Sequence, residues 1–507
     1  MRGPHNIWRL IETLATLERT GANRFVLETM EAPASVRAAA RIIGWPFKWL
    51  GKDGDPNLPP ATRAITALGP AYIKFGQILS TRPDVVGPEM ATHLRVLQDK
   101  LPPFPVEVAK QTVAQELGQP ADELFSEFSE PIAAASIAQV HRARIARTGE
   151  EVAVKVLRPG VERNFRRDID AFYLAASTIE LLAPFSRRLR PTDVIAHFDG
   201  VVEGELDLRI EASAAAEFSA NTEDDAGFVV PRVVWPLSGK RVMTLGWCEG
   251  VPLGDNAALD AAGHDRNALG ERVLSMFLRH ALRDGFFHAD MHQGNMKVAA
   301  NGDLLIFDFG IMGRIDEYTR RVYAEILYGF IRRDYRRVAE VHFEAGYVPP
   351  DQEIDEFAQA LRSVGEPIFG MDATQISMAK LLAYLFEVTE RFGMATRTEL
   401  ILLQRTMVVV EGVARSLNPS INIWEVARPV VEEYIKQNIG PKALARDVAR
   451  TARVLARFGP RLPELAEQAL IAQSNPKPEP ERPMRPVQWM GIGAGFTLLG
   501  VVLASLF

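Results

Sequence analysis

Two short polar motifs near the middle of the chain carry the chemistry of a phosphoryl-transfer site. Residues 288–295 have the sequence HADMHQGN, and Asp308-Phe309-Gly310 begins thirteen positions after Asn295. Phosphoryl transfer needs a carboxylate near the attacking group, together with acidic and amide groups that hold Mg²⁺. Asp290 is suited to the first role, and Asn295 and Asp308 are suited to the second. The spacing therefore predicts a catalytic loop followed by a metal-binding segment.

A lysine on an apolar strand would supply the positive charge. Residues 152–156 are Val-Ala-Val-Lys-Val, an alternating pattern typical of a half-buried strand. Lys155 stands where a lysine pairs the α- and β-phosphates of ATP. Each motif alone could arise by chance, but strand, loop and Asp-Phe-Gly occur in protein-kinase order. Together they predict an α+β, atypical protein-kinase-like two-lobed fold that binds ATP and Mg²⁺.

The same loop permits a weaker alternative, a zinc hydrolase. His288 and His292 stand four positions apart, as zinc ligands on a helix do. However, no glutamate follows His288 as a general base, and Gly294 and Asn295 favour a loop over a helix. We therefore expect a nucleotide site here.

The sequence departs from ordinary protein kinases in three ways. The glycine-rich phosphate loop is replaced by an alanine-rich segment before the lysine strand, with Ala133, Ala134, Ala135 and Ser136 at its centre. Alanine resists the positive φ angles that glycine permits close to phosphates. Ala289 replaces the arginine that pairs with a phosphorylated activation loop. No Ala-Pro-Glu follows Asp308 at a plausible distance. We therefore do not expect protein-substrate docking of the usual kind.

Several further motifs resemble the UbiB family. Residues 68–77, LGPAYIKFGQ, with Ser80-Thr81-Arg82-Pro83-Asp84 behind them, are similar to its Lys-x-Gly-Gln signature. Glu205-Leu206-Asp207, Arg209 and Glu211-Ala212 are also similar to its pattern. The chain differs from the family at Met291 and Gln293, where prolines are usual, and at Ala214, where an asparagine is usual.

This resemblance implies further roles. Lys155 would pair with Glu211 on an αC-like helix, beside an ATP site formed by the alanine-rich loop. The distance along the chain then implies an inserted, mostly helical segment from about Val161 to Asp199. Lys74 would lie with Gln77 on an N-terminal helix, act in catalysis and meet Glu205 and Asp207 as a latch over the pocket. An ammonium facing two carboxylates is physically plausible.

The resemblance also implies a function and partners. We expect an Mg-ATP-dependent ATPase or atypical kinase that supports ubiquinone biosynthesis and handles polyprenylated precursors at the membrane. A kinase of small or lipid substrates is the first alternative. The second is an ATP-switched scaffold for the ubiquinone biosynthetic enzymes.

Composition limits these expectations. The chain has 507 residues, 47% of them hydrophobic, and a net charge of -6, so no global basic field attracts nucleic acid. Cys248 is the single cysteine, so no intrachain disulfide can form. We expect an N-terminal helical extension, a small lobe with a helical insert, a helical large lobe, a linker and an anchor, at residues 1–124, 125–250, 251–474, 475–488 and 489–507.

The two chain ends suggest membrane contact. Residues 489–507 contain no charge and are long enough, at roughly 28 Å, for a transmembrane helix behind the proline-rich linker. Basic residues in the linker predict a single-pass anchor in the bacterial inner membrane, with the main domain cytoplasmic. Gly491 and Gly495 could let two anchors pair in a homodimer. A basic stripe precedes the linker and could either be solvated or meet lipid headgroups: Arg446, Arg450, Arg453 and Arg457.

An amphipathic helix is also expected at residues 6–30. Its apolar positions recur at helical spacing: Ile7, Leu10, Ile11, Leu14 and Leu17. The first interpretation is that this helix packs on the main domain. The second is that it lies on a membrane surface with Trp8 and Arg9 at the interface.

Overall fold

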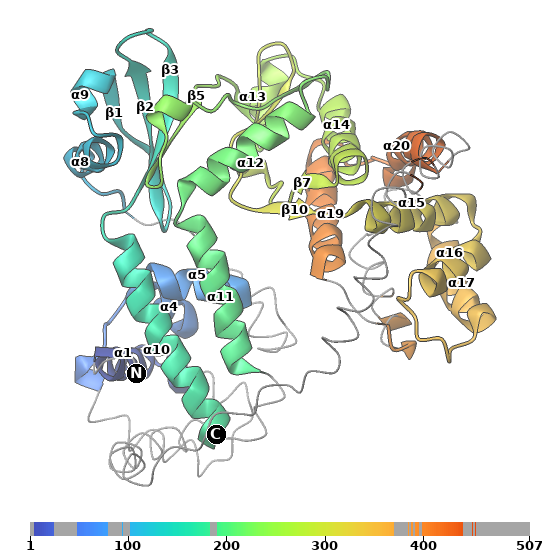
Figure 1. The fold of residues 1–507 in the computed structure, drawn as a ribbon, viewed down its shortest axis with the longest axis horizontal. Coiled ribbons are helices and arrows are strands. Elements are labelled where there is room, and N and C mark those ends of the chain that lie inside the picture. Colours follow the sequence, from blue (N-terminus) through green and yellow to red (C-terminus); the bar gives the residue numbers. More distant parts are fainter. Residues whose placement is uncertain are drawn as a thin grey trace. The chain divides into compact units, whose positions relative to one another are not determined.

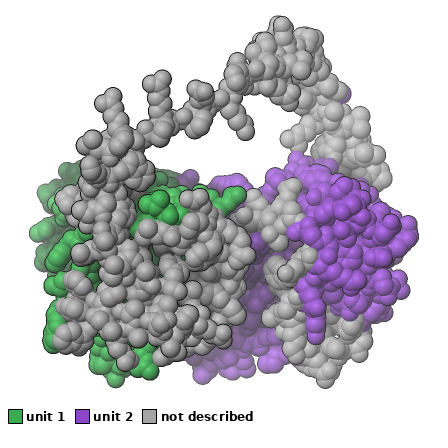
Figure 2. Space-filling model, turned by 90° about the horizontal axis from the view of Figure 1, so that it is seen from below, with its two compact units in different colours: residues 1–212, 233–247, 479–507 green, residues 213–232, 248–478 purple. Residues whose placement is uncertain are grey.

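The computed structural model describes residues 5–24, 48–79, 94, 102–182, 190–369, 384, 387–388, 391–394, 398–439, 449 and 452. The described residues form two compact units, coloured separately in Figure 2. The first comprises the residues up to Ala212 together with Val233–Trp247. The second comprises Ser213–Arg232 and the residues from Cys248 onward. The finer domain boundaries expected from the sequence stay a prediction.

An antiparallel sheet forms the core of the first unit (Figure 1). Its strands lie in the order β1 (Phe125–Ala134), β2 (Ala138–Ile145), β3 (Glu151–Leu157) and β5 (Val242–Gly246). Alternate residues of β3, namely Val152, Val154 and Val156, are fully buried in a cluster with Ala109 and Val113 of α8 (Val106–Leu117). Lys155 therefore projects from the other face of the sheet. The short helices α9 (Ala121–Leu124) and η3 (Trp235–Leu237) complete this layer.

Two long helices follow the lysine strand, as the expected insert requires. They are α10 (Val161–Leu182) and α11 (Pro191–Glu205), which lie side by side in Figure 1. The next helix, α12 (Leu208–Asn221), begins in the first unit and continues into the second. The N-terminal elements α1 (His5–Thr20), η1 (Lys48–Leu50), α4 (Pro60–Leu68) and α5 (Pro70–Leu79) pack together, with α1 and α5 against α10.

The packing of α1 confirms the first interpretation of this helix and corrects the second. Arg9 is 2% exposed, so the expectation that it lies at a membrane interface is wrong. A buried partner, Asp168 of α10, draws it inward. Of the apolar stripe, Leu10 is buried and Ile11, Leu14 and Leu17 are half-buried, so most of the stripe packs. Ile7 and its neighbour Trp8 are 51% and 59% exposed.

Short strands and many helices build the second unit. One sheet has the order β4 (Phe228–Val229), β9 (Leu304–Ile306), β8 (Met296–Val298) and β6 (Val251–Pro252), and a second pairs β7 (Phe286–His288) with β10 (Met312–Arg314). The helices before β10 are α13 (Asn256–Ala261), α14 (Arg266–Arg279), η4 (His280–Asp284) and η5 (Gln293–Asn295). Those after it are α15 (Glu317–Arg332), α16 (Tyr335–Glu344), α17 (Ile354–Phe369), α19 (Thr398–Leu417) and α20 (Ile423–Asn438).

The membrane features expected at the C-terminus lie outside the described residues. These are the linker, the anchor at 489–507 and all four arginines of the basic stripe: Arg446, Arg450, Arg453 and Arg457. Within the part of the chain that the structure describes, no helix is long and apolar enough to cross a bilayer.

A buried carboxylate fixes the chain just before β7. Asp225 accepts hydrogen bonds from Arg283 Nη1 at 2.6 Å and Nη2 at 2.9 Å. His280 Nε2 lies 3.1 Å from the same carboxylate. Burial alone would raise the pKa of Asp225, but the hydrogen bonds from His280 and Arg283 outweigh it and hold this pKa far below its usual range. Asp225 thus anchors η4, which leads into the strand of the catalytic loop.

We predict that Asp225→Asn lowers the melting temperature of the second unit by about 4–8 °C at pH 7, because a buried ion pair loses one charge. A carboxyl group whose pKa is lower in the folded protein than in the unfolded chain, where it is near 4, stabilises the fold at pH values above about 4. This stabilisation is lost as the pH falls toward the pKa of the folded state. The difference from wild type should therefore be constant above about pH 5 and shrink below it. Calorimetry across pH, with the exposed Asp53→Asn as control, tests this; an equal difference at pH 3 and 7 would contradict it.

Candidate active site

A nearly buried ion pair joins the lysine strand to α12. Lys155 Nζ donates to Glu211 Oε1 at 2.6 Å, across fifty-six positions of sequence. The two side chains are 19% and 9% exposed. Strand alternation places Lys155 opposite the apolar core, and Glu211 lies in the first turn of α12. The expected contact is present, and its role toward a nucleotide stays a prediction.

The alanine-rich segment is a tight connection between β1 and β2. Ala133 and Ala134 end β1, and Ala135 donates its N–H to the carbonyl of Ala138 at 2.8 Å. Ser136 is 1% exposed. Arg158, just after β3, donates from Nε to the carbonyl of Ala135 at 3.0 Å. The turn is thus supported from the end of the lysine strand, a contact that the sequence analysis did not anticipate.

The expected latch is present in part. Lys74 of α5 lies 2.8 Å from Glu205 Oε1 at the end of α11, and the two side chains are 14% and 11% exposed. Asp207, the second carboxylate expected near Lys74, accepts from Arg209 Nη2 at 2.6 Å and Nε at 2.9 Å. Gln77 lies on the same helix as Lys74. The ion pair therefore ties α5 to α11.

His288 holds the Asp308-Phe309-Gly310 segment of the second unit in place. Its Nδ1 accepts the N–H of Asp290 at 3.1 Å, so Nε2 carries the proton that it donates to the carbonyl of Asp308. Burial lowers the pKa of His288, which keeps the ring neutral. His292 Nδ1 accepts the N–H of Gly294 at 3.0 Å. Because both rings serve the loop, the zinc alternative finds no support.

The three polar residues of the motifs come from this loop and the strand behind it. Asn295, 8% exposed, donates from Nδ2 to the carbonyl of Asp290 at 3.1 Å. Asp290 itself has a side chain that is 42% exposed. Asp308 follows β9 and accepts the N–H of Gly310 at 3.0 Å.

The side-chain oxygens of Asn295 and Asp308 suit a Mg²⁺ ion that is also bound by phosphates, and they are too few to hold a metal ion by themselves. Among the described residues, no group of three or more His, Cys, Asp or Glu side chains could hold an ion. Mg²⁺ in nucleotide sites usually takes one or two protein oxygens and completes its shell with phosphates and water. Asn295 and Asp308 would hold it, and the ion would neutralise charge on the phosphates.

Packing and a surface ion pair fix the segment after Asp308. The Phe309 ring, 1% exposed, lies 5.8 Å from the ring centroids of both His288 and Phe218. Arg314 of β10 forms a bidentate pair with Glu217, at 2.9 and 2.8 Å. The segment is therefore tied to α12 without a phosphorylated residue.

Helix α19 supports the catalytic loop from behind. Thr406 Oγ1 shares its proton between the carbonyl of Leu402 at 2.8 Å and that of Ala289 at 3.2 Å. Gln293 Nε2 donates to Ser416 Oγ. Gln293 replaces a proline that is usual in the resembling family, and a proline could not make this bond. Sequence reasoning missed Thr406 and Ser416, because hydrogen bonds of this kind follow no spacing rule.

We predict that Arg314→Met loosens the segment after Asp308. Hydrogen exchange in β10 and in the part of α12 around Glu217 should rise about two- to fivefold, because exposed bidentate pairs contribute modestly. Exchange mass spectrometry measures this, with Arg321→Met as control, since Arg321 pairs with Glu317 of its own helix. Unchanged exchange in Arg314→Met would show that the ion pair with Glu217 does not hold the segment after Asp308 against α12.

Comparison with known proteins identifies related chains. The ABC1 atypical kinase-like domain matches residues 96–342, and the UbiB helical domain matches residues 361–422. A Marinobacter nauticus protein named "Probable protein kinase UbiB" is 40% identical over 413 residues, 80% of this chain and 75% of that protein. A protein of the same name from Aeromonas salmonicida is 36% identical over 95% of this chain and 93% of its own.

Solved structures agree with this assignment. A Mycobacterium tuberculosis protein in complex with erythromycin aligns with a TM-score of 0.52 and 25% identity, over 70% of this chain and 90% of its own. The expected kinase-like fold of mixed helices and strands is therefore confirmed. The chain belongs to the UbiB family of ABC1 atypical kinase-like proteins.

Proposed function

We propose that this protein binds Mg-ATP and turns it over in support of ubiquinone biosynthesis at the membrane. The observation that carries the proposal is the ion pair between Lys155 and Glu211, 2.6 Å long and largely buried. A lysine held in this way presents its ammonium to phosphates in a fixed orientation, which protein kinases require for turnover. If this ion pair were only structural, the presence of the other kinase motif residues in the same chain, Asp290, Asn295 and Asp308, would have no explanation.

Each polar group has a role in this reaction. An attacking oxygen, from water or a hydroxyl, bonds to the γ-phosphorus while the bond to the β-phosphate oxygen breaks and ADP leaves. Asp290 accepts the proton of the attacking group, and its exposed side chain is accessible for this. Lys155 stabilises the charge on the phosphates. His288 keeps the backbone of Asp308 in place through its carbonyl.

The membrane and the substrate class are also part of the proposal. The name UbiB of the relatives supports a role in ubiquinone biosynthesis. Polyprenylated precursors are largely apolar and would partition into the bilayer. The apolar segment 489–507 would anchor the protein there. Release of phosphate to water makes the protein an ATPase, and transfer to a lipid or small molecule makes it a kinase.

We predict Mg-dependent phosphate release from ATP by the purified full-length protein, stimulated by anionic liposomes and a polyprenylphenol. Asp308→Asn should lower the turnover by about a hundredfold or more, because it removes a metal ligand at nearly constant volume. A coupled phosphate assay measures this, and Asp303→Asn, on the turn before β9, is the matched control.

The other outcomes separate the alternatives. Radiolabel found on the lipid instead of in free phosphate would establish a kinase. Tight Mg-dependent nucleotide binding without turnover would favour the ATP-switched scaffold. The absence of both binding and turnover would contradict the proposal as a whole.

A second prediction concerns the latch. Lys74→Ala should speed nucleotide release about three- to tenfold without unfolding the chain, because α5 loses its ion pair to α11. Glu205→Gln should act in the same direction. Stopped-flow release of a fluorescent ATP analogue measures the rate, with Lys110→Ala, which removes an ion pair to the exposed Asp122, as control. Unchanged affinity and release in folded Lys74→Ala protein would rule out the latch.

A further inference from the structure

Helix α1 docks through a face that buries several polar side chains beside Leu10 and Ala15. Its most buried polar residues follow helical spacing and are Asn6, Arg9, Thr16 and Thr20, each at most 6% exposed. Ile7 and Trp8 on the same helix are more than half exposed. Buried Leu10 and Ala15 add apolar contacts, but apolar contacts have no fixed direction, so the buried polar groups give α1 its defined orientation.

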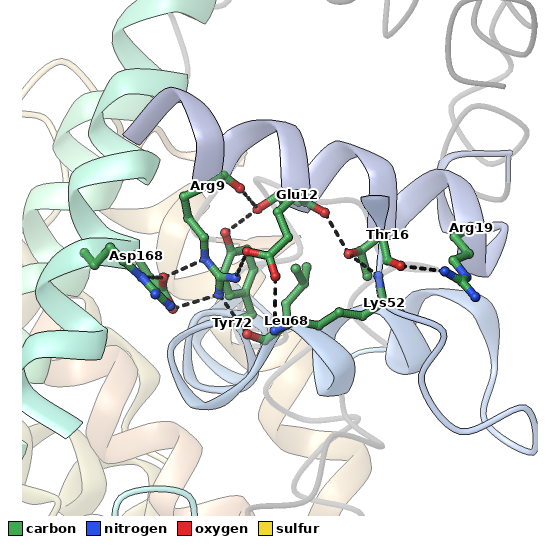
Figure 3. A network of polar contacts seen from close by, with 11 residues as sticks. Arg9, Glu12, Thr16, Arg19, Lys52, Leu68, Tyr72 and Asp168 are labelled. Carbon is green, nitrogen blue, oxygen red and sulfur yellow. Dashed lines mark hydrogen bonds and ion pairs between the residues drawn. The ribbon is translucent and has the colours of Figure 1, made fainter. Parts of the chain in front are cut away.

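Arg9 makes most of these polar contacts (Figure 3). Its Nε and Nη2 donate to the two oxygens of Asp168 on α10, at 2.7 and 3.0 Å, and its Nη1 donates to Glu12 at 2.7 Å. The side chains of Arg9 and Asp168 are 3% and 4% exposed. Arg167 also approaches Asp168, at 3.4 Å, but its side chain is 47% exposed. The bidentate geometry requires the planar guanidinium, which lysine lacks.

The same guanidinium reaches the junction of α4 and α5. Its Nη2 donates to the carbonyl of Leu68, the last residue of α4, at 2.8 Å. Gly69 follows with a φ of 109°, a conformation that glycine tolerates and other residues avoid, and α5 begins at Pro70. Arg9 therefore caps one helix at the bend where the next one starts.

Tyr72 adds a second contact to the first turn of α5. Arg9 lies 5.0 Å from the centre of its ring. The Thr13 hydroxyl donates to the carbonyl of Arg9, so the Tyr72 hydroxyl, 2.5 Å away, must donate to Thr13. Burial raises the pKa of Tyr72 to about 12, so this donor keeps its proton at physiological pH.

A cluster of aromatic rings joins α5 to α10 and α11. Tyr72 and Phe75 of α5 lie 4.7 and 5.0 Å from Phe172 of α10, measured between ring centroids. Phe75 also lies 5.1 Å from Phe198 of α11, the helix that ends at Glu205. Lys74 stands between Tyr72 and Phe75 in the chain, so the rotation of α5 about its axis decides whether Lys74 reaches Glu205.

We propose that Arg9 is a positioning residue for Lys74, fixing the bend and rotation of α5 so that the ion pair with Glu205 forms. Arg9 contacts Leu68, Tyr72 and Asp168, and it acts on Lys74 through them. The positioning of Lys74 by Arg9 does not depend on the proposed function. Only its expected consequence, a change in the rate of nucleotide release, rests on the function proposed for Lys74.

Chemical labelling of Lys74 tests the geometry without any nucleotide. Acylation of the full-length protein, followed by peptide mass spectrometry, gives the rate at Lys74, with Lys110 as internal reference. Arg9→Met should raise the Lys74 rate about three- to tenfold, and Arg9→Lys should raise it less. Arg19→Met is the matched control, because Arg19 joins the same helix to Asp53 and Gly51 but not to α5. It should leave the rate at Lys74 unchanged.

Two results would overturn the proposal. One is a Lys74 rate equal to wild type in folded Arg9→Met protein. The other is an equal rise in Arg19→Met, which would mean that any loosening of α1 suffices. Should Arg9→Met fail to fold, Asp168→Asn removes the same bidentate pair and carries the same expectations.

A double-mutant cycle then tests the functional consequence. Arg9→Lys should speed nucleotide release in the wild-type background and have no further effect in Lys74→Ala. Additive effects on release would mean that Arg9 does not act through Lys74. A wild-type protein that binds no Mg-nucleotide would contradict the proposed function alone, since the labelling rates still decide the role of Arg9.

Discussion

A lysine that is four-fifths buried needs a carboxylate partner, and in this chain the partner of Lys155 is fifty-six positions away. That requirement constrains most of the first unit. The chain must leave β3, form α10 and α11, and return so that the first turn of α12 meets the strand. The insert is therefore more than an addition to a kinase-like lobe. It provides the surface on which the N-terminal helices pack, and its second helix ends at Glu205, the partner of Lys74.

The N-terminal helices depend on charge as much as on apolar burial. One guanidinium joins α1, α10 and the junction of α4 and α5, and the aromatic rings of α5, α10 and α11 extend that contact. Breaking a buried pair is costly because it leaves an uncompensated charge. A helix held in this way keeps a defined position, and its exposed Ile7 and Trp8 take no part in the docking.

The sequence predicts the chemistry of the site better than the packing around it. Asp290 and Asn295 share one loop and Asp308 follows the next hairpin, so a short spacing along the chain marks all three as motif residues. Glu211 could be selected only through the family resemblance, because nothing local marks the end of a long insert. The burial of Arg9 was missed because hydrophobic periodicity treats arginine as a surface residue. The signal that could have revealed it is the polar stripe Asn6, Arg9, Thr13, Thr16 and Thr20, which repeats at intervals of three and four.

We propose that Asn295 and Asp308 hold a divalent ion only together with nucleotide phosphates. Electron paramagnetic resonance of Mn²⁺, used in place of Mg²⁺, tests this without knowledge of the phosphoryl acceptor. We expect weak Mn²⁺ binding to the protein alone, tight binding when ADP or ATP is added, and loss of the tight site in Asp308→Asn. Tight Mn²⁺ binding that ignores nucleotide, or that survives in Asp308→Asn, would contradict it.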